Sequence, residues 1–130
     1  MIVVDASAVL ELLLRTPAAD RVAERVLAPT ETLHAPHLVD LEVAQVVRRY
    51  VRSGEIDEPR GAVALADLGD LPIRRYRHDI FLSRIWELRG AVTAFDAAYL
   101  ALSEALSAPL ITRDARLASA PGHEATVELI

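Results

Sequence analysis

Short apolar runs of strand length recur along the chain, and a longer segment with helical periodicity separates each run from the next. The strand-like runs cover residues 2–4, 33–35, 73–76, 110–112 and 126–130. Two parallel strands need a connection of about a dozen or more residues, usually a helix, whereas an antiparallel hairpin needs only a short turn. The alternation therefore predicts an α/β domain with a mainly parallel central sheet flanked by helices.

The intervening segments are predicted as helices over residues 6–15, 17–28, 37–53, 58–71, 78–89 and 93–107. Pro17 and Pro59 suit the first turn of a helix, and Gly54 and Gly90 suit the position just past a helix end. No linker, repeat or low-complexity tract divides the 130 residues. We therefore expect a single domain over residues 1–130.

The composition excludes several classes of protein and site. There is no cysteine, which rules out disulfides, thiolate nucleophiles and zinc held by sulfur. The first residues lack the basic segment of a secretory signal, and no apolar run is long enough to cross a bilayer. A soluble cytoplasmic protein is therefore expected. Aromatic residues make up 5% of the chain, too few to predict a surface that stacks nucleobases.

The charge balance narrows the choice of partners. The net charge is −5, and all 14 basic residues are arginine. Nucleotide bias in a high-GC genome accounts for this usage on its own, but the planar guanidinium is also the cation best suited to phosphate. An acidic total argues against non-specific wrapping of DNA, while leaving room for local arginine contacts beside an acidic site.

Four acidic residues fall where an α/β fold would bring them together. Asp5 and Asp114 each follow a predicted strand, and sites in parallel sheets gather beyond the carboxyl ends of the strands. Asp96 lies in the first turn of a strongly apolar helix, and Glu42 lies among apolar neighbours on the long helix. The positions predict one acidic site built from distant parts of the chain.

Taken singly, three of these acids have a simpler explanation. Asp5 and Asp114 each precede a helical segment, where aspartate commonly caps the free N–H groups of the first turn. Thr93 and Asp96 have the spacing of a capping box. Helix capping explains each position by itself, but it does not explain why the acids fall on elements that converge.

The alternatives for the remaining polar candidates also stay open. Glu42 would be a partly exposed residue beside Arg49 if it had no role in a site. Asp40 competes with it, but two positions along a helix place Asp40 on a different face. His34 and His37 offer no convincing metal site, because Pro36 breaks the element between them.

The ordered set of motifs resembles PIN-domain ribonucleases and, more narrowly, the VapC-type toxins of VapBC toxin–antitoxin modules. The resemblance rests on Asp5-Ala6-Ser7, on Glu42, on TAFDAAYLAL over residues 93–102 and on LITRD over residues 110–114. It covers the whole chain and implies a PIN-domain fold. Within the second motif Phe95 stands where the family often has tyrosine, which keeps an aromatic ring and loses a hydroxyl.

The resemblance also implies roles for particular residues. The acidic, metal-binding and catalytic residues would be Asp5, Glu42, Asp96 and Asp114, with Ser7 and Thr112 as supporting hydroxyls. Carboxylates that crowd together raise one another's pKa unless a cation joins them, and Mg²⁺ prefers such hard oxygen ligands, with Mn²⁺ a possible substitute. Arg15 and Arg113 are candidates for contacts with substrate phosphates, although each is equally explained as a surface residue.

The function implied by the resemblance is a Mg²⁺-dependent endoribonuclease toxin of a type II toxin–antitoxin system. It would cleave structured cellular RNA, either transfer RNA or ribosomal RNA, by attack of a metal-activated water, and a cognate VapB-like antitoxin would inhibit it. A homodimer is expected, with DNA contacted only through the antitoxin complex and no membrane partner. A phosphoacceptor signalling domain would need a lysine that the chain lacks, whereas a non-catalytic PIN-like interaction module remains an alternative.

Overall fold

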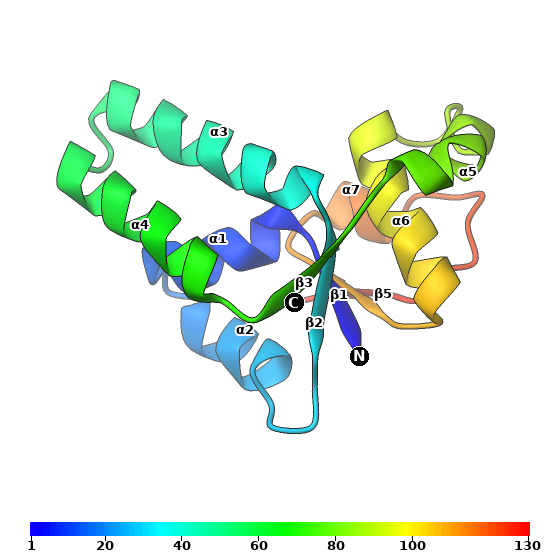
Figure 1. Cartoon of the computed structure of the whole chain (residues 1–130), viewed down its shortest axis with the longest axis horizontal. Helices are drawn as coiled ribbons and strands as arrows, with labels where there is room; N and C mark the ends of the chain where they lie inside the picture. Colours follow the sequence, from blue (N-terminus) through cyan, green and yellow to red (C-terminus); the bar gives the residue numbers. More distant parts are fainter.

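The sheet is fully parallel and has five strands. The computed structural model describes residues 1–130, and Figure 1 shows the strands between two groups of helices. The strands are β1 (Ile2–Val4), β2 (Leu33–Pro36), β3 (Ile73–Tyr76), β4 (Leu110–Thr112) and β5 (Val127–Leu129). They are ordered β3-β2-β1-β4-β5, and every neighbouring pair is parallel. The predicted fold class is confirmed.

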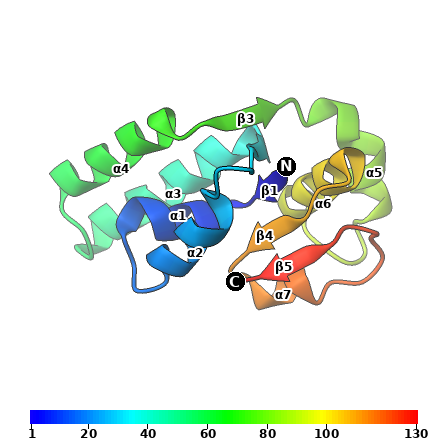
Figure 2. The same cartoon turned by 90° about the horizontal axis from the view of Figure 1, so that it is seen from below.

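Seven α-helices and one 3₁₀ turn connect and cover the strands. They are α1 (Ala6–Leu14), α2 (Ala19–Val26), α3 (Leu38–Ser53), α4 (Glu58–Asp70), η1 (Asp79–Phe81), α5 (Leu82–Glu87), α6 (Ala94–Leu106) and α7 (Ala115–Ala118). Helices α1 to α4 lie on one side of the strands, and α5 and α6 lie on the other (Figures 1 and 2). None of the helices combines the length and the hydropathy that a membrane span requires.

Two helices differ from the sequence-based prediction. The helix expected from Pro17 begins at Ala19, because the preceding residues form a turn in which the Ala19 N–H donates to the Thr16 carbonyl at 2.9 Å. The helix expected over residues 78–89 is a 3₁₀ turn followed by the short α5. Proline fixes only its own φ angle, and it suits a turn as well as a first helical turn.

The core is aliphatic and is centred on β1. The three residues of β1 are at most 1% exposed, and they belong to a cluster of 26 buried apolar residues. Helix α6 is buried along Ala97–Ser103, which explains its nearly continuous apolar sequence. Strands covered on both faces are expected to lack the alternation of apolar and polar residues, and all three residues of β1 are apolar.

The strand order creates a crevice at a defined place. From β1 the chain first builds outward through β2 and β3, and it later returns to add β4 and β5 on the opposite side. Ligands of open parallel sheets bind outside the carboxyl ends of the strands where the order reverses, here beside β1 and β4. The register pairs Val4 with Ile111, which places the next residues, Asp5 and Thr112, side by side.

Candidate active site

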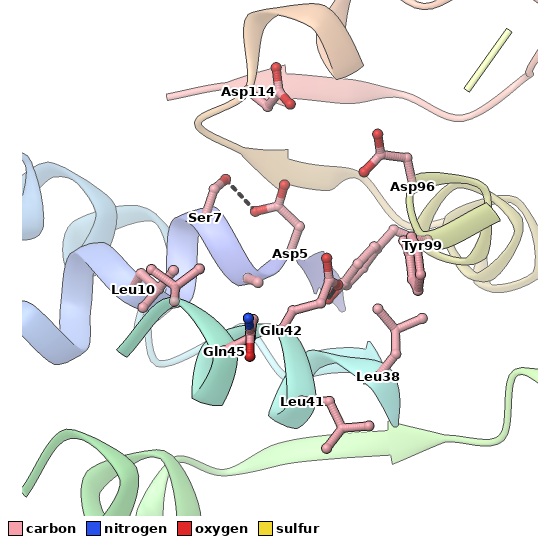
Figure 3. A pocket seen from close by; sticks show the side chains of 13 residues that line it. Asp5, Ser7, Leu10, Leu38, Leu41, Glu42, Gln45, Asp96, Tyr99 and Asp114 are labelled. Carbon is pink, nitrogen blue, oxygen red and sulfur yellow. Dashed lines mark hydrogen bonds between the residues drawn. The ribbon is translucent and has the colours of Figure 1, made fainter. Parts of the chain in front are cut away.

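One cavity of about 520 Å³ lies at this crevice, and all four candidate acids line it. Asp5 follows β1, Glu42 comes from α3, Asp96 from the first turn of α6, and Asp114 follows β4. Figure 3 shows their carboxylates facing a common space, with Asp5 between Glu42 and the other two. Residues separated by up to 109 positions therefore meet through the sheet topology.

Asp5 is held more tightly than the other acids. It is 6% exposed, and its Oδ1 accepts hydrogen bonds from Ser7 Oγ at 2.6 Å and from the Ala8 N–H at 3.0 Å. Its Oδ2 accepts from Thr112 Oγ1. Burial raises the pKa of Asp5, while these hydrogen bonds act in the opposite direction. Asp5 thus caps α1 and faces the cavity at once, so the capping explanation and the site explanation are compatible.

The two predicted hydroxyls connect the strand ends. Thr112 is fully buried, and its Oγ1 donates to Asp5 while accepting from the Asp114 N–H at 3.0 Å. Ser7 Oγ donates to Asp5 and accepts from the Arg113 N–H at 2.8 Å. Each hydroxyl joins the end of β1 to the end of β4, and together they fix the orientation of the Asp5 carboxylate.

Glu42 has a partner that the sequence analysis did not identify. Tyr99, on α6, donates from its hydroxyl to Glu42 Oε1 at 2.8 Å. Burial raises the pKa of Glu42, with smaller contributions from the charges of Asp96 and Asp5, and the Tyr99 hydrogen bond opposes the rise. Tyr99 lies three residues after Asp96, on the same helix face. This three-residue spacing from Asp96 was the one sequence feature that could have placed Tyr99 at the site.

Asp96 and Asp114 stand at the starts of helices, as the capping explanation expected. The Thr93 Oγ1 accepts from the Asp96 N–H at 3.2 Å, and the Asp114 carboxylate accepts from the Arg116 N–H at 2.9 Å. Burial raises the pKa of Asp96, and the charges of Asp114 and Asp5 add to the rise. The helix starts therefore bring two further carboxylates within electrostatic reach of Asp5.

The competing polar residues are engaged elsewhere. Asp40 forms an ion pair with Arg75 on β3, with 2.8 Å between Oδ2 and Nε. His34 is buried on β2, with its ring nitrogens 2.7 Å from the Tyr76 hydroxyl and 2.8 Å from the Thr32 hydroxyl. Neither lines the acidic cavity.

Comparison with known proteins agrees with this arrangement. The family model of the PIN domain matches residues 2–122. Ribonuclease VapC12 of Mycobacterium tuberculosis is 45% identical over 130 residues, covering 100% of this chain and 99% of that protein. Ribonuclease VapC1 of the same species is 42% identical over 129 residues, covering 98% and 96%. The chain belongs to the VapC ribonucleases of the PIN-domain family. It is a nuclease of the VapBC toxin–antitoxin type.

Solved structures show the same fold at much lower sequence identity. The Mycobacterium tuberculosis toxin VapC20, described as cleaving the sarcin–ricin loop, has a TM-score of 0.70 at 15% identity and covers 92% of this chain and 94% of its own. VapBC2 from Rickettsia felis, bound to a DNA fragment from its promoter, has a TM-score of 0.71 at 14% identity and covers 99% and 98%. The VapC architecture thus persists where most side chains differ.

The two arginines expected near substrate phosphates are placed differently in this VapC ribonuclease. Arg15 ends α1 in a left-handed conformation, with φ 50°, and lines a different hollow from the acidic cavity. The Arg113 guanidinium pairs with Glu11 at 3.3 Å and donates to the Ile130 carbonyl. Neither side chain lines the acidic cavity, and their contact with substrate phosphates stays a prediction.

The donor chemistry of the cavity suits a hard divalent cation. Its polar lining includes four carboxylates and the Ser7 hydroxyl, with no histidine or cysteine. No three of the four carboxylates stand close enough together to ligate one ion directly. Mg²⁺ usually retains several waters and takes only one or two protein carboxylates, so it fits a cavity whose acids are spread around its wall.

An exposed aromatic side chain stands at the mouth of the same cavity. Phe95 lines it and is 63% exposed, beside Asp96 on α6. The low aromatic content of the chain gave no reason to predict a surface that stacks bases. Composition counts residues and carries no information on where they lie, and a single exposed ring at a site suffices for one base.

Proposed function

We propose that the chain is a Mg²⁺-dependent endoribonuclease toxin in which Asp5, Glu42, Asp96 and Asp114 are the catalytic carboxylates. The observation that carries the proposal is the convergence of four carboxylates, from four separate elements, in one cavity at the reversal of the strand order. Burial raises the pKa values of Asp5, Glu42 and Asp96, so negative charge in this cavity is unfavourable unless a cation is bound beside it.

The residues have distinct tasks in this proposal. A bound divalent metal lowers the pKa of a water and stabilises the charge on the departing oxygen. Asp5, Asp96, Glu42 and Asp114 would hold the ion, directly or through its waters, with Mn²⁺ able to replace Mg²⁺. Ser7 and Thr112 orient Asp5, and Tyr99 orients Glu42. Attack by water leaves a 5′ phosphate and a 3′ hydroxyl and requires no substrate 2′-OH.

The substrate class is structured cellular RNA, with transfer RNA first and ribosomal RNA second. The description of VapC20 as a toxin that cleaves the sarcin–ricin loop supports a structured target for a protein of this fold. Specificity among RNAs comes from shape and from contacts around the cavity, because the metal chemistry itself is indifferent to sequence. Mapping the new 5′ ends in total cellular RNA after incubation with the purified toxin identifies the target.

Cleavage by metal-free and Mg²⁺-loaded protein tests the proposal directly. We expect cleavage with Mg²⁺ and none with chelator, and we expect Asp96→Asn to lose it. Asp20→Asn is the matched control, because Asp20 is exposed on α2 and makes no ion pair. Wild-type rates in Asp96→Asn would refute the assignment, and metal binding without any cleavage would favour a non-catalytic interaction module.

The partner expected for such a toxin is a VapB-like antitoxin. The cavity has an apolar side made by Leu10, Leu38, Leu41 and Val46 next to the acids. An amphipathic segment could lie along these residues and place an arginine among the carboxylates, since arginine pairs bidentately with them. Inhibition should then weaken as Mg²⁺ rises, and antitoxin lacking its tail arginines should show no such dependence.

The oligomeric state proposed for the chain also comes from its likeness to VapC toxins. We expect a homodimer that binds DNA only through the antitoxin complex, as the Rickettsia felis complex with promoter DNA suggests. Val63 and Leu65 are exposed on α4 and supply apolar surface for an isologous contact. Light scattering that returned only monomer would contradict this expectation.

A further inference from the structure

A second hollow of about 530 Å³ lies beside the acidic cavity and has no role in the proposed chemistry. Asp96 and Asp114 line both hollows, so the two hollows adjoin at these residues. Its remaining lining comes from the segment between α5 and α6 and from α7. These two walls carry one arginine each, Arg89 and Arg116.

The Arg89 guanidinium is held in place by Trp86, and no acidic side chain neutralises its charge. Its guanidinium carbon lies 4.4 Å from the centre of the Trp86 ring, and Nη1 donates to the Trp86 carbonyl at 2.8 Å. No acidic side chain forms an ion pair with it, and it is exposed. A cation fixed over an aromatic ring keeps its charge and has lost part of its conformational freedom before a ligand arrives.

Arg116 projects from the opposite wall. Its side chain is 94% exposed, and its Nε lies 3.6 Å from Asp114 Oδ1, beyond hydrogen-bond distance. The charge of Arg116 acts against the rise in the pKa of Asp96, so it reaches the acidic cavity electrostatically. An exposed ion pair at this distance is weak, so the Arg116 guanidinium can leave Asp114 and bind a phosphate instead.

The other arginines near these elements do not offer free charge. Arg84 on α5 pairs with Glu104 at 2.8 Å and with Glu87 at 2.8 Å. Arg113, next to Asp114, pairs with Glu11. Four carboxylates repel a nucleic acid unless positive charge stands beside them. Arg89 and Arg116 are the only arginines that line the two adjoining hollows.

We propose that Arg89 and Arg116 form a phosphate-binding subsite that holds the RNA backbone next to the bond to be cleaved. The strand would run from this second hollow past Asp96 and Asp114 into the acidic cavity. Contacts to phosphate position a nucleic acid without reading its sequence, so the subsite sets register and affinity. The inference rests on the proposed ribonuclease function and adds the path of the substrate across this face.

Salt-dependent binding without metal tests the subsite separately from cleavage. The probe is a short, fluorescein-labelled polyuridine RNA, titrated with the whole protein in chelator over a series of salt concentrations. Each phosphate contact to a single strand contributes about 0.7 to the slope of log affinity against log salt. The double variant Arg89→Ala, Arg116→Ala should therefore lower the magnitude of the slope by about 1.4 and weaken binding at low salt.

Two further double variants make the test specific. Arg21→Ala with Arg52→Ala removes the same charge from exposed positions on α2 and α3, where neither arginine forms an ion pair, and should leave the slope unchanged. Arg89→Lys with Arg116→Lys keeps both charges and should retain most of the slope. Both proposed contacts come from exposed side chains, so thermal unfolding of all variants should match that of the wild type.

The outcomes separate this inference from the proposed function. Equal slopes for the wild type and the double alanine variant would overturn the subsite, as would an equal loss in the Arg21 and Arg52 control, or no salt-dependent binding by the wild type. Cleavage of cellular RNA by the wild type with Mg²⁺ is measured independently. Binding that depends on Arg89 and Arg116 without any cleavage would refute the ribonuclease proposal and leave the subsite standing.

Discussion

The acidic cavity has a closed floor, formed by Asp5 and Ser7 with Thr112 hydrogen-bonded behind Asp5, and an open rim, formed by Asp96 and Asp114. The Asp5 carboxylate accepts three hydrogen bonds from the protein and is almost fully buried. The Asp114 carboxylate accepts one, from a backbone N–H, and its side chain is 32% exposed. The protein therefore determines the geometry of the floor, whereas a bound ion or substrate can still adjust the rim.

The difference follows from where each carboxylate lies in the sheet. The floor sits between β1 and β4, and the register of these strands brings the hydroxyls and Asp5 together. At the rim, Asp96 lies in the first turn of α6 and Asp114 follows β4, and both side chains are only partly buried. A fixed floor with an adjustable rim suits a site that must hold an ion and admit a large substrate, because only one part has to move.

The largest expected effect is at the floor. Asp5→Asn should reduce cleavage by more than about 100-fold, since changes even one shell away from a metal cost about 10- to 100-fold. The amide keeps the size of the side chain and removes the charge. Single-turnover cleavage of the mapped RNA measures the loss, with Asp20→Asn as the control of equal charge change. Comparable rates in the two variants would remove Asp5 from the site.

The hydroxyl that joins floor and rim should come next. Thr112→Val should reduce cleavage by about 10- to 100-fold, because it leaves Asp5 Oδ2 and the Asp114 N–H without their partner. Each buried group left unpaired should also cost about 1–3 kcal/mol of unfolding free energy. Thr112→Ser keeps the hydroxyl and should retain most activity. Denaturant unfolding and cleavage of both variants test whether the hydroxyl, rather than the methyl group, is responsible.

Tyr99 should have a smaller effect, expressed in metal dependence. Tyr99→Phe removes the hydrogen bond to Glu42 and should raise the Mg²⁺ concentration needed for half-maximal cleavage by about tenfold. Stability should fall by about 1 kcal/mol, the usual contribution of one hydrogen bond. A purely structural residue would change stability and leave the Mg²⁺ midpoint unchanged, so an unaltered midpoint would contradict the positioning role.

The smallest expected effect is a pH dependence of stability at the floor. The pKa of Asp5 is raised above its ordinary value of 3.8, so the folded state binds the proton more tightly than the unfolded state. Well below pH 3.8 the Asp5 carboxyl is protonated in both states and does not lower the free energy of unfolding. The free energy of unfolding falls as pH rises from 3.8 to the raised pKa and then stays constant with respect to this group. Asparagine does not titrate.

The measurement compares unfolding temperatures of metal-free wild type and Asp5→Asn over the acidic to neutral range. The advantage of the variant should grow by a few degrees as pH rises, since about 1 kcal/mol corresponds to roughly 4–8 °C in a small domain. Mg²⁺ should reduce that advantage. A difference that stays constant with pH would show that the Asp5 carboxyl is not perturbed by folding.

Most of the fold could be predicted because it depends on local patterns. Apolar runs of strand length, helical segments of crossover length and turn residues between them specify a parallel α/β sheet without tertiary information. The boundaries near Pro17 and residues 78–89 could not be predicted, because short turns and a 3₁₀ segment use the same residues as the first turn of a helix.

The sequence alone predicted that the four acids would lie together, because each stands at a strand end, at a helix start or among apolar neighbours, and strand ends of a parallel sheet share one edge. Ser7 and Thr112 were expected as supporting hydroxyls, but only the tertiary structure decided that Tyr99 supports Glu42 and where free positive charge lies. Tyr99 meets Glu42 across 57 positions, and Arg89 meets Arg116 across a hollow that no local pattern encodes. Arg113, adjacent to an acid in sequence, is turned away by its pairing with Glu11. Side-chain partners depend on packing between elements, and the periodicity of a single element carries no record of that packing.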